Sequence, residues 1–70
     1  MMPLNFAEPG EEAIIRRIGG SPEAKKHLED LGFVVGGTVC IVSRLGENLI
    51  VRVKESRVAI DEAMARKIMV

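Results

Sequence analysis

The feature that constrains this chain most is the stretch from Leu28 to Val42, LEDLGFVVGGTVCIV, because it joins the end of a helix to the start of a strand. Gly32 can adopt the left-handed conformation that ends a helix, and Phe33 can then fold back onto Leu28 in the apolar contact that accompanies such a cap. The pair Gly36-Gly37 permits a sharp turn before a β-rich run. The helix is therefore predicted to lie between strands.

The residues before this cap have the pattern of a short amphipathic helix. Ala24, Leu28 and Leu31 recur at the spacing of one helical face, and charged residues fill the other face. Ser21 is suited to accept a hydrogen bond from the first free helical N–H groups, and Pro22 fits the first helical position. We expect one helix with a single buried side.

β-rich runs separated by turn residues predict the rest of the fold. In the arm that follows Leu45-Gly46-Glu47-Asn48, residues Leu49, Val51 and Val53 share the core side of an antiparallel hairpin. Asp61 is expected to cap a helical turn. Such short strands favour a small antiparallel barrel of about five strands, mainly β with one inserted helix, which leaves no free sheet edge. The predicted strands are 11–18, 38–44, 49–54, 57–60 and 67–70.

Length and composition narrow the class of protein. Seventy residues with 47% hydrophobic residues predict a single domain, residues 1–70, with one small core. Leu4 and Phe6 in the N-terminal segment are expected to lie as an apolar flap over that core. The chain has no run long enough to cross a bilayer, and its single cysteine, Cys40, suits a reducing compartment. A cytoplasmic protein is therefore expected.

Three groups of residues resemble the ferrous iron transport protein A (FeoA) family over almost the whole chain. They are Pro9-Gly10-Glu11 before an Ile-rich strand, the Leu-Gly-Phe-x-x-Gly-x-x-Val signature over 31–39, and the closing Ala-x-x-Ile-x-Val over 65–70. The loop at 45–48 is shorter than the segment that many members have between the hairpin arms, and the second arm, 48–54, resembles a compact sub-branch of the family. The resemblance implies an SH3-like β-barrel with an inserted helix. It also implies a small cytosolic partner of FeoB, the ferrous iron transporter with a cytosolic GTP-binding domain, which would bring this chain to the membrane only through that partner.

The sequence has few residues that are typical of catalysis or metal binding. The sequence has no Ser/His/Asp set, no phosphate-binding loop and no paired carboxylates on one rigid element, so we expect no enzymatic activity and no tightly bound cofactor. The weak metal candidates are His27, Cys40 and Asp61, and they lack the spacing of ligand pairs; a structural zinc site needs about four clustered ligands. A site for Fe(II) or another divalent transition metal could form across a homodimer. The alternative function is therefore a metal-responsive domain that acts as a dimer.

Two surfaces are candidates for contact with a partner. Arg44, Arg52, Lys54 and Arg57 could share the exposed face of the hairpin, where a solvated surface is favoured over a nucleic-acid platform; the same cations could instead meet an acidic protein surface. Ten acidic residues balance ten basic ones and there is no Trp or Tyr, which argues against nucleic acid. The second surface is the apolar edge of the helix and its turn, part of which we expect to stay exposed as a docking patch for the transporter. Its candidate residues are Leu28, Leu31, Phe33, Val34 and Val35.

Overall fold

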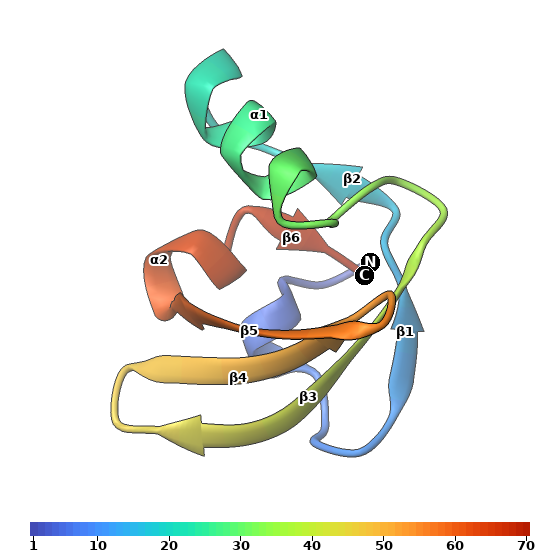
Figure 1. Ribbon diagram of the computed structural model, residues 1–70, viewed down its shortest axis with the longest axis vertical. Helices are drawn as coiled ribbons and strands as arrows, with labels where there is room; N and C mark the ends of the chain where they lie inside the picture. The colour runs from blue at the N-terminus through green and yellow to red at the C-terminus, as the bar shows by residue number, and fades with distance from the viewer.

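The computed structural model describes all 70 residues, and its strands form two antiparallel sheets (Figure 1). The two helices are α1 (Pro22–Asp30) and α2 (Glu62–Ala65), and a short 3-10 helix, η1, spans Leu4–Phe6. The predicted mainly β, antiparallel fold with a helix inserted between strands is confirmed. The larger sheet has the order β1 (Glu12–Ile14), β3 (Thr38–Leu45), β4 (Asn48–Val53), β5 (Ser56–Asp61), and the smaller pairs β2 (Arg17–Ile18) with β6 (Ile68–Met69). The prediction that no sheet edge is left free is wrong, because β1 and β5 are the edge strands of the larger sheet.

The predicted first strand is two strands, because the chain changes partners in its middle. The Ile15 N–H donates to the Gly37 carbonyl oxygen at 2.9 Å, next to β3, whereas the N–H of the following residue, Arg16, donates to the Met69 oxygen at 2.8 Å, in β6. Ile15 at this change of direction is fully buried. The segment 11–18, predicted as one strand, thus contributes to both sheets, which is why the structure has six strands and not five.

Helix α1 begins and ends where the sequence predicts. The Ser21 hydroxyl oxygen accepts a hydrogen bond from the Ala24 N–H at 3.1 Å. At the other end the Phe33 N–H donates to the Leu28 carbonyl and the Gly32 N–H donates to the Glu29 carbonyl, both at 2.9 Å. With Gly32 at φ +107°, these two bonds form a Schellman motif. The side chains of Phe33 and Leu28 are both fully buried, as this motif requires of its apolar contact.

A β-bulge in β3 changes which side of the larger sheet its last residues face. Val39 lies opposite Val53 and Ile41 opposite Val51, but the register shifts between Ile41 and Ser43. Beyond the bulge Arg44 lies opposite Leu49, a core residue. The prediction that Arg44 shares the exposed face with Arg52, Lys54 and Arg57 is therefore wrong, because the extra residue reverses the alternation of the strand.

One apolar core lies between the two sheets and the helices. The N-terminal segment contributes Leu4, which is fully buried, whereas Phe6 is 67% exposed, so only the first of these two residues covers the core. Met2 and Val70 exchange two backbone hydrogen bonds, at 2.9 and 2.8 Å, which places the chain ends side by side (Figure 1). The buried cluster comprises Leu4, Ala7, Ile15, Leu28, Phe33, Val39, Ile41, Leu49, Val51, Val53, Ile60, Ala65 and Ile68.

Candidate functional site

The turn after α1 is held rigidly against the end of β1. The Gly37 N–H donates to the Val34 carbonyl at 3.0 Å and Gly36 has φ +90°, which together define a type II turn with Val35 at its apex. Two further backbone bonds fix this turn in place: the Gly36 N–H donates to the Ile15 carbonyl at 2.8 Å, and the Ile15 N–H donates to the Gly37 carbonyl at 2.9 Å. The side chains on the turn are therefore presented in a fixed position.

Three aliphatic side chains are exposed at this place, which we call the apolar corner: Ile14, Val34 and Val35. Val35 is 63% exposed, Ile14 50% and Val34 36%. Ile14 directly precedes the residue to which the turn is bonded, and the loop passes beside the end of β1 (Figure 1). Single exposed aliphatic residues are ordinary, but a group of them on rigid backbone is typical of a contact surface.

The five predicted docking residues differ in how much of each is exposed to solvent. Leu28 and Phe33 are fully buried and Leu31 packs partly against the core, so the first two cannot touch a partner directly. For Leu28 and Phe33 the docking assignment is corrected, because the Schellman motif turns both side chains inward. Val34 and Val35 keep the exposure that docking needs. Ile14 was not among the residues predicted from the sequence. It is exposed because β1 is an edge strand of the larger sheet and the alternation of the strand turns Ile14 outward.

The outer face of the larger sheet carries a row of charged and thiol side chains across its four strands. Glu12 lies opposite Cys40, Cys40 opposite Arg52, and Arg52 opposite Arg57. Cys40 is only 6% exposed, and its thiol lies 3.6 Å from the Ile41 carbonyl oxygen. A pocket of about 150 Å³ opens on this face, and it is lined by Glu12, Thr38, Val39, Cys40, Arg52 and Lys54.

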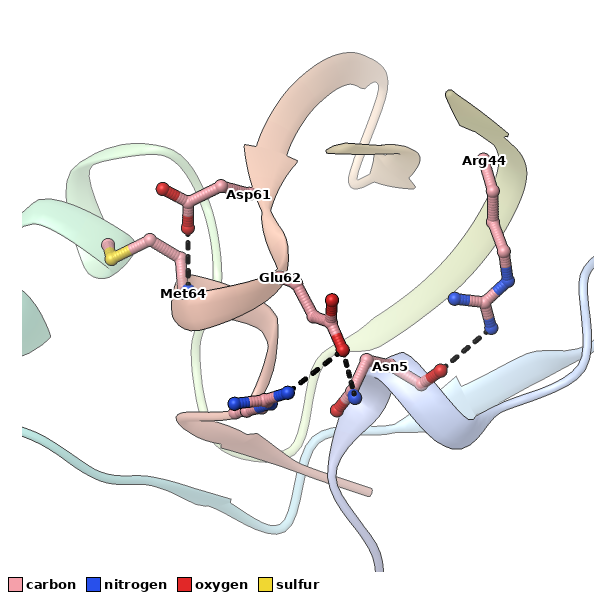
Figure 2. A network of polar contacts seen from close by, with 6 residues as sticks. Asn5, Arg44, Asp61, Glu62 and Met64 are labelled. Carbon is pink, nitrogen blue, oxygen red and sulfur yellow. Dashed lines mark hydrogen bonds and ion pairs between the residues drawn. The ribbon is translucent and has the colours of Figure 1, made fainter. Parts of the chain in front are cut away.

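The three weak metal candidates are not brought together. His27 is exposed on α1, Cys40 is buried in β3, and an oxygen of the Asp61 carboxylate accepts the Met64 N–H at 2.8 Å as the cap of α2 (Figure 2). No three His, Cys, Asp or Glu side chains lie close enough to hold a metal ion. A metal site built from these residues would need ligands from a second copy of the chain.

Arg44 belongs to a polar network on the other side of the sheet (Figure 2). Its guanidinium donates to the carbonyl oxygens of Asn5 at 2.8 Å and Ala7 at 3.0 Å. The Asn5 amide nitrogen lies 3.5 Å from the Glu62 carboxylate, which also pairs with Arg66 at 3.1 Å. The network ties the N-terminal segment to β3 and α2, so Arg44 has a structural role that the sequence did not reveal.

The helices of the chain are all too short to cross a membrane. Two surfaces stand out in this structure: an apolar corner on a rigid turn, and beside it a sheet face with a polar pocket.

Comparison with known proteins identifies the family. The model of the FeoA domain family matches residues 2–70. A protein of Methanocaldococcus jannaschii named "Putative Fe(2+) transport protein A" is 34% identical over 70 residues, which is all of this chain and 85% of that protein.

Solved structures agree with this match. The crystal structure of an iron uptake regulatory protein, FeoA, superposes with a TM-score of 0.87 at 27% identity, over 96% of this chain and 89% of that one. FeoA of Stenotrophomonas maltophilia in complex with zinc, described as a prokaryotic SH3 domain protein, gives a TM-score of 0.84 at 25% identity, over 99% and 88% of the two chains. The SH3-like fold expected from the sequence is thereby confirmed. Because the family model matches residues 2–70 and solved FeoA structures share the fold, the chain belongs to the FeoA domain family.

Proposed function

We propose that this protein is a non-enzymatic, cytoplasmic accessory protein of ferrous iron uptake that docks on the cytosolic GTP-binding part of a FeoB-type transporter and modulates it. It needs no tightly bound cofactor for this role, and it reaches the membrane only through the transporter. The observation that carries the proposal is the apolar corner: aliphatic side chains held exposed by a turn with four backbone hydrogen-bonding groups engaged.

The corner has the properties of a docking point. A rigid surface loses little conformational entropy on binding, so more of the contact energy appears as affinity. Each Å² of aliphatic surface that binding removes from water contributes about 25 cal/mol to the free energy of binding. The family match supports the iron transport setting, and the Stenotrophomonas relative is itself described as a candidate ferrous iron transport activating factor.

The proposal is tested by titrating the ¹⁵N-labelled protein with the soluble GTP-binding domain of a FeoB transporter and following amide shifts. We expect shifts at Val34, Val35 and the end of β1. The variant Val35→Ser should weaken binding about tenfold, the effect of losing 1.4 kcal/mol of contact energy. Leu45→Ser is the matched control, because Leu45 is 68% exposed at the distant hairpin turn.

Two results would count against docking at this corner. One is the absence of binding by the unaltered protein, which would remove the proposed function itself. The other is equal weakening by Val35→Ser and Leu45→Ser, which would show that general surface hydrophobicity, rather than the corner, governs the contact.

A metal-responsive dimer is the second candidate, and the zinc complex of the Stenotrophomonas relative is the observation that favours it. In this chain such a site would take His27, Cys40 or Asp61 from two copies. Sedimentation velocity with and without Fe(II) or Zn(II), under anaerobic conditions for iron, separates the two functions. A metal-dependent dimer would support the second candidate, and an unchanged sedimentation coefficient would support docking alone.

A further inference from the structure

Three cations share the outer face of β4 and the turn and strand that follow it, which we call the basic face: Arg52, Lys54 and Arg57. All three are exposed, and none has an acidic partner within the chain, whose only ion pair joins Arg66 to Glu62. The register places Arg52 directly opposite Arg57. Like charges in this position destabilise a sheet.

Lys54 adds backbone strain to the same face. It has φ +54° in the turn between β4 and β5, and it is the only residue other than glycine with a positive φ. Glycine or asparagine would adopt this conformation at lower cost. The two-residue turn between the paired residues Val53 and Ser56 favours a positive φ, so the fold fixes the place of Lys54 at the end of this face.

The pocket described above lies on this basic face. Arg52 and Lys54 form one side of it, and its only carboxylate is Glu12, which is separated from Arg52 by the whole width of β3. Thr38, which also lines the pocket, lies opposite Ile14 of the apolar corner. A positive, polar pocket therefore directly adjoins an exposed aliphatic surface.

We infer that the basic face receives an acidic segment of the partner protein. One aspartate or glutamate carboxylate of that segment enters the pocket beside Arg52 and Lys54, and neighbouring aliphatic side chains of the segment cover the apolar corner. Charge complementarity is the basis for this choice of occupant. The inference rests on the proposed function, since the partner is taken to be the cytosolic part of the transporter.

Protein rather than nucleic acid is the occupant that the surface favours. The formal net charge of the chain is zero, so no long-range field draws a polyphosphate to it. The face has no aromatic residue on which bases could stack: Phe33 is buried, and Phe6 belongs to the N-terminal segment. The Glu12 carboxylate, which lines the pocket, can accept a backbone N–H of a protein segment, a donor that a nucleic-acid backbone lacks.

The test compares Arg52→Glu with Arg17→Glu in binding to the soluble GTP-binding domain of the transporter. Arg17 is exposed on β2, outside the basic face, so both variants change the charge equally. We expect Arg52→Glu to raise Kd at least tenfold and Arg17→Glu to leave it within twofold. Binding of the unaltered protein should weaken between 50 and 300 mM salt, and this salt dependence should be smaller for Arg52→Glu.

Arg52→Gln, which removes the charge without reversing it, should give an intermediate Kd, and a dispersed amide spectrum verifies that each variant is folded. If the transporter domain binds the Arg52 and Arg17 variants equally well, the inference is overturned while the proposed function stands. If the unaltered protein does not bind the domain, both are overturned. Tighter binding of a single-stranded oligonucleotide than of the transporter domain, abolished by Arg52→Glu, would overturn the inference by showing a nucleic-acid surface.

Discussion

Replacing Phe33 by alanine tests the part of the fold on which the candidate surface depends. Phe33 is fully buried, and it closes α1 through the Schellman motif immediately before the turn that presents Val34 and Val35. Removing a buried phenylalanine ring costs about 3–5 kcal/mol, from lost transfer energy and the cavity left behind. A domain of this size has a total stability of roughly 4–10 kcal/mol at 0.05–0.15 kcal/mol per residue, so the variant loses a third of its stability or more.

The measurement is urea unfolding followed by far-ultraviolet circular dichroism, because the chain has no Trp or Tyr for fluorescence. With a urea dependence of about 1–2 kcal/mol per molar for a small domain, the midpoint should fall by about 1.5–5 M. The chain provides its own control in Phe6→Ala. Phe6 is the other phenylalanine and is 67% exposed, so its replacement should change the free energy of unfolding by less than about 0.5 kcal/mol.

The reasoning would be refuted by a Phe33→Ala midpoint within experimental error of the Phe6→Ala midpoint. Such a result would mean that the ring of Phe33 is not packed in the core. The Schellman contact would then not exist in solution, and the turn that carries the apolar corner would have lost its anchor.

Three further predictions concern stability and use the same unfolding measurement. Gly32→Ala should destabilise by about 1–2 kcal/mol, because Gly32 has φ +107°; its loss should exceed that of Ser21→Ala, which removes only a cap worth about 1 kcal/mol. Arg44→Met should lower the free energy of unfolding by about 1–2 kcal/mol, because it removes the hydrogen bonds to Asn5 and Ala7. Arg17→Met should leave that free energy almost unchanged, and equal effects of the two variants would contradict the structural role of Arg44. Lys54→Gly should raise stability by about 0.5 kcal/mol by relieving the backbone at φ +54°, and a loss of stability would contradict the assignment of strain there.

Local signals in the sequence predicted the helix and the hairpin accurately. Ser21, Pro22, Gly32 and Phe33 define both ends of α1 through interactions between near neighbours, and such interactions are visible without the fold. The alternation of Leu49, Val51 and Val53 likewise gave the core side of β4. The family resemblance then supplied the SH3-like arrangement, which no local pattern contains.

What the sequence could not predict depends on contacts between distant residues. The split of the first strand follows from the change of partner between Ile15 and Arg16, whose partners, Gly37 and Met69, are distant in sequence from the strand and from each other. The bulge beyond Ile41 has no signal in residue type, yet it removes Arg44 from the basic face. The exposure of Ile14 depends on which strand occupies the sheet edge, which is a property of the topology.

The pairing of Met2 with Val70 has a consequence for how this domain can be rearranged in a polypeptide. Because the chain enters and leaves the fold at one point, a short flexible linker could join its ends, and new ends could be opened at Gly46-Glu47 in the exposed hairpin turn. Such a circular permutant would keep the native strand pairings while turning the pairing of β3 with β4 from one of the two most local in the sheet into the least local. Its folding should slow accordingly, since closing a long loop must precede that pairing.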